Sequence, residues 1–116
     1  MDNESILVTI KKLLGLPEEY EQFDTDVIIG INTAFMTLNQ LGVGPSKGFS
    51  ISDKTTTWSE YLPENSDLEG VKSYIHLNVN LLFDPPQNAT LMDAINRQIN
   101  MLEFRLGVNA DKGEEV

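Results

Sequence analysis

The segment 71–106 constrains the fold more than any other part of this sequence. Two stretches with apolar residues at helical spacing flank the sequence Asp84-Pro85-Pro86. Proline has no backbone N–H to donate, and it disfavours helical backbone in the residue before it. The prolines therefore end one helix firmly. A second helix restarts just after them, and we expect Thr90 to be its N-cap with Asp93 as the capping-box partner.

Apolar periodicity predicts four helices in all, near residues 6–14, 24–41, 66–83 and 90–106. The residues expected to cap their starts are Asp2 or Asn3, Asp24 with Thr25, Ser66 with Glu69, and Thr90. The glycines expected to end three of them are Gly15, Gly42 and Gly107. The helix at 66–83 is apolar around much of its circumference. It is therefore either central in the fold or covered on a second side by a neighbouring subunit. Gly30, inside the second helix, either allows close packing or is simply tolerated.

Residues 43–66 form a long connection that is rich in glycine, proline, serine and threonine. Phe49 and Ile51 alternate with serines, which indicates a short extended piece, while Trp58 and Tyr61 have the spacing of a helical turn. Two interpretations stay open: a loop folded over the core, and a loop that is functional or ordered by a partner. The predicted fold class is all-α.

This fold would be a small four- to five-helix bundle with a long central loop. We expect a single domain over residues 1–108, followed by a flexible acidic tail over residues 109–116.

The formal net charge of −10, from 18 acidic and 8 basic residues, limits the classes of partner. Tight binding to nucleic-acid phosphates or to an anionic membrane surface normally needs clustered Lys and Arg. The charge is explained either by solubility or by a surface that meets a basic partner. The chain has no cysteine, which excludes disulfides and thiolate metal sites. No apolar run approaches the roughly 20 residues that span a bilayer, and the acidic start predicts no secretory signal.

Catalytic patterns are weak in this sequence. His76 is the single histidine, and we expect it to be a surface or boundary residue. The carboxylates between Glu18 and Asp26 are dense, but acids at a helix start are favoured by the helix dipole alone. A small hydrolase built from these acids and His76 is the least favoured interpretation. We expect no enzymatic activity, no cofactor and no metal.

Several motifs occur in a characteristic order along the chain. Their residues are Ile31-Asn32, Ala34, Leu38, Gln40 to Gly44, Trp58 to Leu62, Tyr74 to Leu77, Leu81 to Pro86, and Leu102 to Leu106. In this order and spacing they resemble the head–tail connector proteins of tailed bacteriophages and prophages. The resemblance covers nearly the whole chain.

The resemblance implies a non-enzymatic structural adaptor that takes part in virion assembly and DNA packaging. It would form a homo-oligomeric ring beneath the portal protein, generally matching the portal's dodecameric symmetry. The ring would extend the DNA channel, so double-stranded DNA would pass through without specific binding. Head-completion or tail proteins would dock onto it. The protein would be located at the head–tail interface of the virion, and in the host cytoplasm during assembly.

We expect protein–protein contacts to use the central loop, at Phe49, Ile51, Trp58 and Tyr61, together with the tail after Gly107. Arg105 either complements the helix C-terminus or forms an inter-subunit salt bridge. An alternative function is an acidic soluble binding or regulatory module that targets a basic surface of a nucleic-acid-binding protein.

Overall fold

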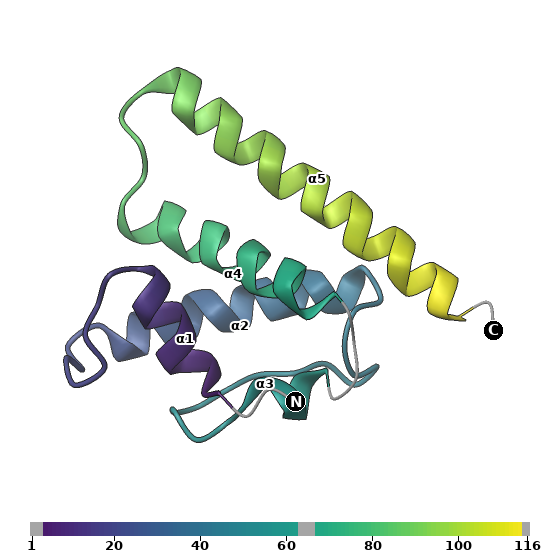
Figure 1. Cartoon of the computed structure of the whole chain (residues 1–116), viewed down its shortest axis with the longest axis horizontal. Coiled ribbons are helices and arrows are strands. Elements are labelled where there is room, and N and C mark those ends of the chain that lie inside the picture. Colours follow the sequence, from purple (N-terminus) through teal and green to yellow (C-terminus); the bar gives the residue numbers. More distant parts are fainter. Residues whose placement is uncertain (1–3, 63–66, 115–116) are drawn as a thin grey trace.

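A computed structural model describes the backbone of residues 4–62 and 67–114, and side chains as far as residue 110. The helices are α1 (Ile6–Leu13), α2 (Asp24–Gln40), α3 (Trp58–Tyr61), α4 (Leu68–Phe83) and α5 (Ala89–Glu114). The molecule measures 43 × 36 × 22 Å (Figure 1). The described residues contain no strand, only one isolated bridge between Ser5 and Thr57. The predicted all-α fold is confirmed.

Helix α4 lies at the centre of the fold. It packs against α2, α5 and α1, and these contacts cover most of its circumference. The fully buried residues of the core come mainly from α1, α2 and α4, and the largest are Trp58, Tyr74, Phe35, Ile6, Ile10, Ile31, Leu38 and Ile75. The apolar circumference predicted for this helix is therefore used inside one chain.

Gly30 allows α2 and α4 to approach closely. A β-carbon at this position would lie 3.3 Å from the side chains of both Val79 and Leu82. The glycine therefore has a packing role, which distinguishes between the two interpretations of its sequence position.

A buried lysine holds the segment between α1 and α2. The Lys11 ammonium donates hydrogen bonds to the carbonyl oxygens of Glu18 at 2.9 Å and Tyr20 at 2.7 Å. It also lies 2.8 Å from Oδ1 of Asp24, in an ion pair whose lysine side chain is almost fully buried. A buried ammonium must be compensated in this way because it has lost its hydration. Lys11 thus fixes the return of the chain into α2.

The ends of the helices agree only partly with prediction. Gly15 and Gly42 follow α1 and α2 with φ values of +82° and +87°, as predicted. The start of α1 is capped by Ser5, whose Oγ accepts a hydrogen bond from Val8 N at 3.2 Å. The predicted caps Asp2, Asn3 and Ser66 lie outside the described residues. Helix α2 begins at Asp24 without a side-chain cap, so Asp24 and Thr25 are wrong as caps.

The predicted start and end of the last helix are also wrong. Asn88 is the N-cap instead of Thr90, because its Oδ1 accepts a hydrogen bond from Leu91 N at 3.1 Å. The helix continues through Gly107 to Glu114. A helical glycine costs only about 1 kcal/mol relative to alanine, which is too little to end a helix of this length. The backbone of 109–114 is helical, whereas the flexibility of a tail over 109–116 remains a prediction.

Candidate interaction surfaces

The central loop is closed onto the helices by side-chain hydrogen bonds to its backbone. Nδ2 of Asn32 donates to the carbonyl of Ile51 at 2.9 Å, and the N–H of Ile51 donates back to Oδ1 of Asn32 at 2.8 Å. Nδ2 of Asn39 donates to the carbonyl of Pro45 at 3.1 Å. These bonds satisfy backbone groups that have no partner in a regular element. The Asn side chains of α2 therefore give the loop backbone the hydrogen bonds that a neighbouring strand would give in a sheet.

An aromatic cluster fixes the middle of the loop. The rings of Phe35, Phe49 and Tyr61 lie 4.6–5.2 Å apart, centroid to centroid. Burial raises the pKa of the Tyr61 phenol, whose hydroxyl donates to the carbonyl of Val43 at 3.5 Å. Gly44 has a φ of +87°, and a β-carbon there would lie 2.5 Å from Cε1 of Tyr61. Position 44 thus requires glycine for both conformation and space.

Trp58 anchors the end of the loop to the start of α1. Its indole N–H donates to Oγ1 of Thr9 at 3.0 Å, and its backbone N–H donates to the carbonyl of Glu4 at 3.1 Å. The Lys72 ammonium lies 5.5 Å from the centre of the Trp58 ring, within cation–π range. Trp58 has no exposed surface. The loop therefore contributes a wall of the core.

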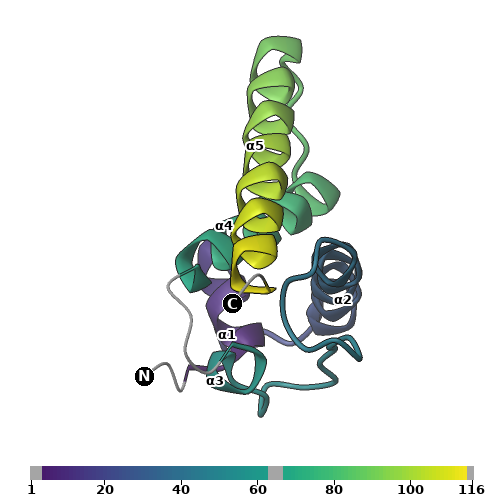
Figure 2. The same cartoon turned by 90° about the vertical axis from the view of Figure 1, so that its right-hand side faces the viewer.

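Helix α5 is docked along its C-terminal half and projects along its N-terminal half (Figures 1 and 2). Ile99 and Leu106 are buried against the body, whereas none of residues 89–98 is buried. Two polar contacts add to the docking: the Tyr74 hydroxyl donates to Glu103 at 2.7 Å, and Asn109 donates to Asp67 at 3.1 Å. Burial, and then the Glu103 carboxylate, raise the pKa of Tyr74. The phenol consequently remains a hydrogen-bond donor.

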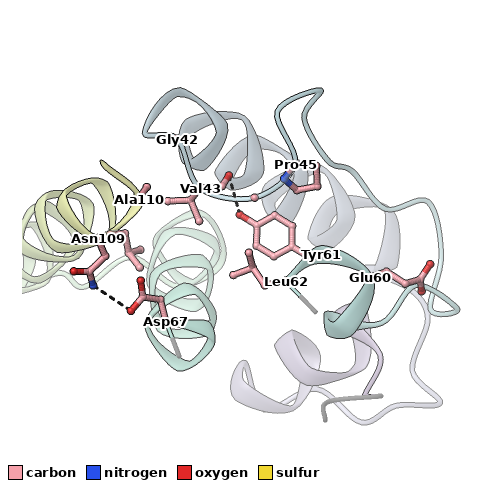
Figure 3. Close-up of a pocket in the computed structure, with 11 residues that line it drawn as sticks. Gly42, Val43, Pro45, Glu60, Tyr61, Leu62, Asp67, Asn109 and Ala110 are labelled. Carbon is pink, nitrogen blue, oxygen red and sulfur yellow. Dashed lines mark hydrogen bonds between the residues drawn. The ribbon is translucent and has the colours of Figure 1, made fainter. Parts of the chain in front are cut away.

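An open groove lies where α5 meets the loop, with a volume of about 470 Å³ (Figure 3). Its lining comes from the turn after α2, from α3 and from α5, and includes Val43, Tyr61, Leu62, Leu106 and Ala110. In Figure 3 the Asn109–Asp67 hydrogen bond closes one side, and the Glu60 carboxylate points away from the groove. Two of its polar side chains, Asn109 and Asp67, bond to each other, and Glu60 accepts hydrogen bonds from Thr57. Its lining residues therefore include no converging set of ionisable groups.

Large apolar side chains are exposed at several places outside the groove. Those on α2, α4 and α5 are Ile29, Met36, Leu82, Leu91, Met101, Phe104 and Val108. Phe104 has the highest exposed fraction, at 72%. Scattered exposed apolar residues are normal, but an aligned set of them marks an interaction surface. Met101, Phe104 and Val108 have helical spacing on α5 and form such a set.

The candidate chemical groups are dispersed. His76 is half-buried, and burial lowers its pKa against the opposing effect of a hydrogen bond with the Leu13 backbone. It is a boundary residue, as predicted. Glu18, Glu19, Glu21 and Asp26 are exposed, and Asp24 pairs with Lys11. Across the described residues, no three His, Cys, Asp or Glu side chains are grouped to hold a metal ion.

Comparison with known families decides what kind of protein this is. A family model described as phage connector protein matches residues 6–113. The chain belongs to the phage connector family. A search of curated proteins and a search of solved structures each find no match. The family predicted from the sequence motifs is thus confirmed, and phage connector families are structural and typically non-enzymatic. None of its helices, where described, is both long and apolar enough to cross a membrane.

The structure places the predicted contact residues of the connector in two different environments. Ile51, Trp58 and Tyr61 are buried, and Phe49 is half-buried in the aromatic cluster. The loop accordingly follows the interpretation of a segment folded over the core. Direct contact of a partner with the three buried side chains would require the loop to open.

Arg105 of the connector is exposed and forms no ion pair within the described part of the chain. The helix dipole acts on charges within the last turn, and α5 continues for nine residues beyond Arg105. The helix-end role considered for this residue therefore loses its basis, and an inter-subunit contact remains a prediction.

The sequence interpretation missed the second apolar stripe of α5. Met101, Phe104 and Val108 follow each other at i, i+3 and i+7, which is the spacing of one helix face. Only the buried face of Ile99, Leu102 and Leu106 was predicted. The second stripe has the same spacing and lies two residues further along the helix. The signal was present in the periodicity of the segment.

Proposed function

We propose that this connector is a head–tail adaptor that forms a ring beneath the portal protein, extends the DNA channel and provides a docking platform for later head-completion or tail proteins. The observation that carries the proposal is the family match over residues 6–113. Ring stoichiometry would follow the portal, which we propose to be dodecameric. Assembly would take place in the host cytoplasm, and the product would be located at the head–tail interface.

Charge supports the channel part of this function. With a formal net charge of −10, the chain repels DNA phosphates, so a lumen built from it would let DNA slide. The exposed carboxylates occur in the 14–23 connection, in the central loop, near the starts of helices and at Asp84 after α4, instead of forming one row. This distribution gives no specific support to the alternative of a regulatory module that imitates DNA on one face.

The open surfaces support the assembly part. A compact body with an exposed apolar stripe on α5 is what a subunit requires if it is to bind other proteins without refolding its core. We propose that the loop rim around Phe49, the C-terminal residues after Gly107, and Arg105 take part in these contacts. The three buried loop residues would act indirectly, by fixing the shape of that rim.

Sedimentation velocity with and without the portal protein encoded by the same phage tests the function. We expect the connector alone to sediment as a monomer or weak oligomer, and to co-sediment with the portal at micromolar concentrations. A filter-binding assay with double-stranded DNA should show no retention above background. Failure to co-sediment with the portal would contradict the proposal.

A further inference from the structure

Helix α5 has two apolar faces on opposite sides. Ile99, Leu102 and Leu106 face the body, and Met101, Phe104 and Val108 are each shifted from one of them by two positions. Two positions along an α-helix correspond to about 200° of rotation. The second stripe therefore points away from the core, and its members are exposed. A surface helix normally has one apolar stripe, so the second one needs a partner.

The outward stripe also carries positive charge. The two arginines of the chain, Arg97 and Arg105, are exposed and lie about one helical turn before and after Met101 on the same side of α5. Neither forms an ion pair with any described residue. We define Arg97, Met101, Phe104, Arg105 and Val108 as the α5 outer face. Two copies of this face would repel each other, so it favours a partner that is apolar and acidic.

Such a surface exists on α2 of the same chain. Ile29 and Met36 are seven positions apart on one side of α2 and are 58% and 66% exposed. Asp26 lies three positions before Ile29 on the same side, is exposed, and forms no ion pair with a described residue. We define Asp26, Ile29, Thr33 and Met36 as the α2 outer face. The exposed carboxylates of Glu18, Glu19 and Glu21 lie in the connection that leads into α2, and they add negative charge near its start.

The two faces are matched in type and lie on different helices. Each combines exposed apolar side chains at i and i+7 with a charge before them, negative on α2 and positive on α5. In Figure 1 the acidic start of α2 lies at the left, away from the C-terminal half of α5 at the right, whereas the other end of α2 approaches α5, where Leu41 lies beside position 107. A subunit with two different complementary patches associates head to tail, and such contacts form rings when the rotation closes.

We propose that the α5 outer face of one copy docks on the α2 outer face of the next copy. This inference rests on the proposed function, because it names the surfaces through which the ring subunits meet. The contact is heterologous: the apolar side chains of the two helices pack together, and Arg97 or Arg105 pairs with Asp26 and the carboxylates that precede it. Rim charges of this kind mainly orient the partners, and the apolar centre supplies most of the affinity.

Disulfide cross-linking tests the pairing directly, because the chain has no cysteine of its own. Phe104→Cys and Met36→Cys are prepared as separate proteins, and each is assembled on the portal alone or mixed with the other. Leu91→Cys is the matched control, since Leu91 is an exposed apolar residue of α5 outside the α5 outer face. We expect cross-linked dimers in the mixture of Phe104→Cys and Met36→Cys, several-fold above each single variant and above Leu91→Cys mixed with Met36→Cys.

Each other outcome overturns part of the account. Cross-linking of Phe104→Cys alone at the same rate would show that α5 pairs with itself, and would overturn the inference. The absence of cross-links above the Leu91→Cys control, with wild-type protein still co-sedimenting with the portal, would overturn the inference and leave the function in place. Loss of portal binding and of self-association in the wild type would overturn both.

A charge reversal adds a second readout. Arg105→Glu together with Arg97→Glu should reduce assembly at least tenfold. Lys12→Glu together with Lys54→Glu makes the same change in net charge at exposed positions outside both faces, and should leave assembly unchanged. Equal assembly of both proteins would contradict the role of the arginines. Circular dichroism of each variant verifies that the helices are intact.

Discussion

Irregular loops are usually exposed and regular helices usually cover the core, but the central loop and helix α5 of this protein do the opposite. Residues 43–62 have little regular structure, yet Ile51, Trp58 and Tyr61 are buried and the loop backbone is bonded to α2 and to the start of α1. Helix α5 is fully regular, yet it exposes Phe104 and Met101 to solvent. An irregular segment can therefore be part of the core, while a regular helix presents the surface for partners.

Backbone hydrogen bonding explains this contrast. A helix satisfies its own N–H and C=O groups, so α5 can project from the body without a cover. The loop cannot do so, and its polar backbone groups need partners elsewhere in the fold. Asn32 and Asn39 of α2 supply two of them. The need to pair backbone N–H and C=O groups thus fixes the loop against α2, whereas α5 meets the same need within its own helix.

The largest expected effect contrasts two aromatic residues. Trp58→Ala should reduce the free energy of unfolding by about 3–5 kcal/mol, because it opens a large cavity and removes the bond to Thr9. Phe104→Ala should change it by no more than about 0.5 kcal/mol, since Phe104 is mostly exposed. Urea unfolding followed by circular dichroism measures both. Similar losses of unfolding free energy in the two variants would contradict the conclusion that the loop is part of the core while this face of α5 is exposed.

Gly44→Ala should be the next most destabilising change. The left-handed backbone costs a non-glycine residue about 1–2 kcal/mol, and the close approach to Tyr61 adds about 1–3 kcal/mol of overpacking. Gly15→Ala is the matched control, because its φ is +82° but no atom lies within 4 Å of the new β-carbon. For Gly44→Ala, the midpoint temperature of thermal unfolding should be well below that of Gly15→Ala. The reverse order would contradict close packing of the loop around Tyr61.

Asn32→Ala should destabilise the chain by about 1–3 kcal/mol, because it leaves the backbone groups of Ile51 unsatisfied. Asn32→Asp keeps the acceptor for the Ile51 N–H but places a carboxylate oxygen against the Ile51 carbonyl, so it should not restore the lost stability. Limited proteolysis provides a second measure, with new cleavage expected between residues 43 and 57 in the alanine variant. Unchanged cleavage in this range would show that the side chain does not hold the loop.

The smallest expected effect concerns pH. Burial lowers the pKa of His76 from its ordinary value of 6.5, so just below this pH the unfolded chain binds a proton that the folded chain does not. The stability contribution is complete above pH 6.5 and falls as the pH is lowered. His76→Gln should make the stability less dependent on pH between 7.5 and about 5.5. A steeper dependence in the variant would contradict the burial of this imidazole.

Much of the helical framework was predictable from periodicity and breakers. The prolines at 85 and 86, Gly15 and Gly42 end their helices as the sequence indicates. Local rules failed at two places on α5: the helix continues through Gly107, because a helical glycine costs only about 1 kcal/mol, and Asn88 replaces Thr90 as cap. The stripe of Ile99, Leu102 and Leu106 was predicted from the periodicity. The opposite stripe was not predicted, because a surface helix normally has only one apolar face.

The candidate surface was harder to predict than the fold. Aromatic residues in a long polar loop are typical of a binding segment, and nothing local distinguishes them from residues that fold back over a core. The side chains that decide the matter, Asn32 and Thr9, are 19 and 49 positions away from their partners Ile51 and Trp58. Such long-range pairing is a property of the tertiary structure alone.

Hydrogen exchange of the connector, free and assembled on its portal protein, tests the central claim most directly. The account predicts new protection along residues 97–108 and 26–36, with the amides of Ile51 and Trp58 already protected in the free chain and unchanged on assembly. New protection confined to residues 49–61, with α5 and α2 exchanging as before, would contradict it.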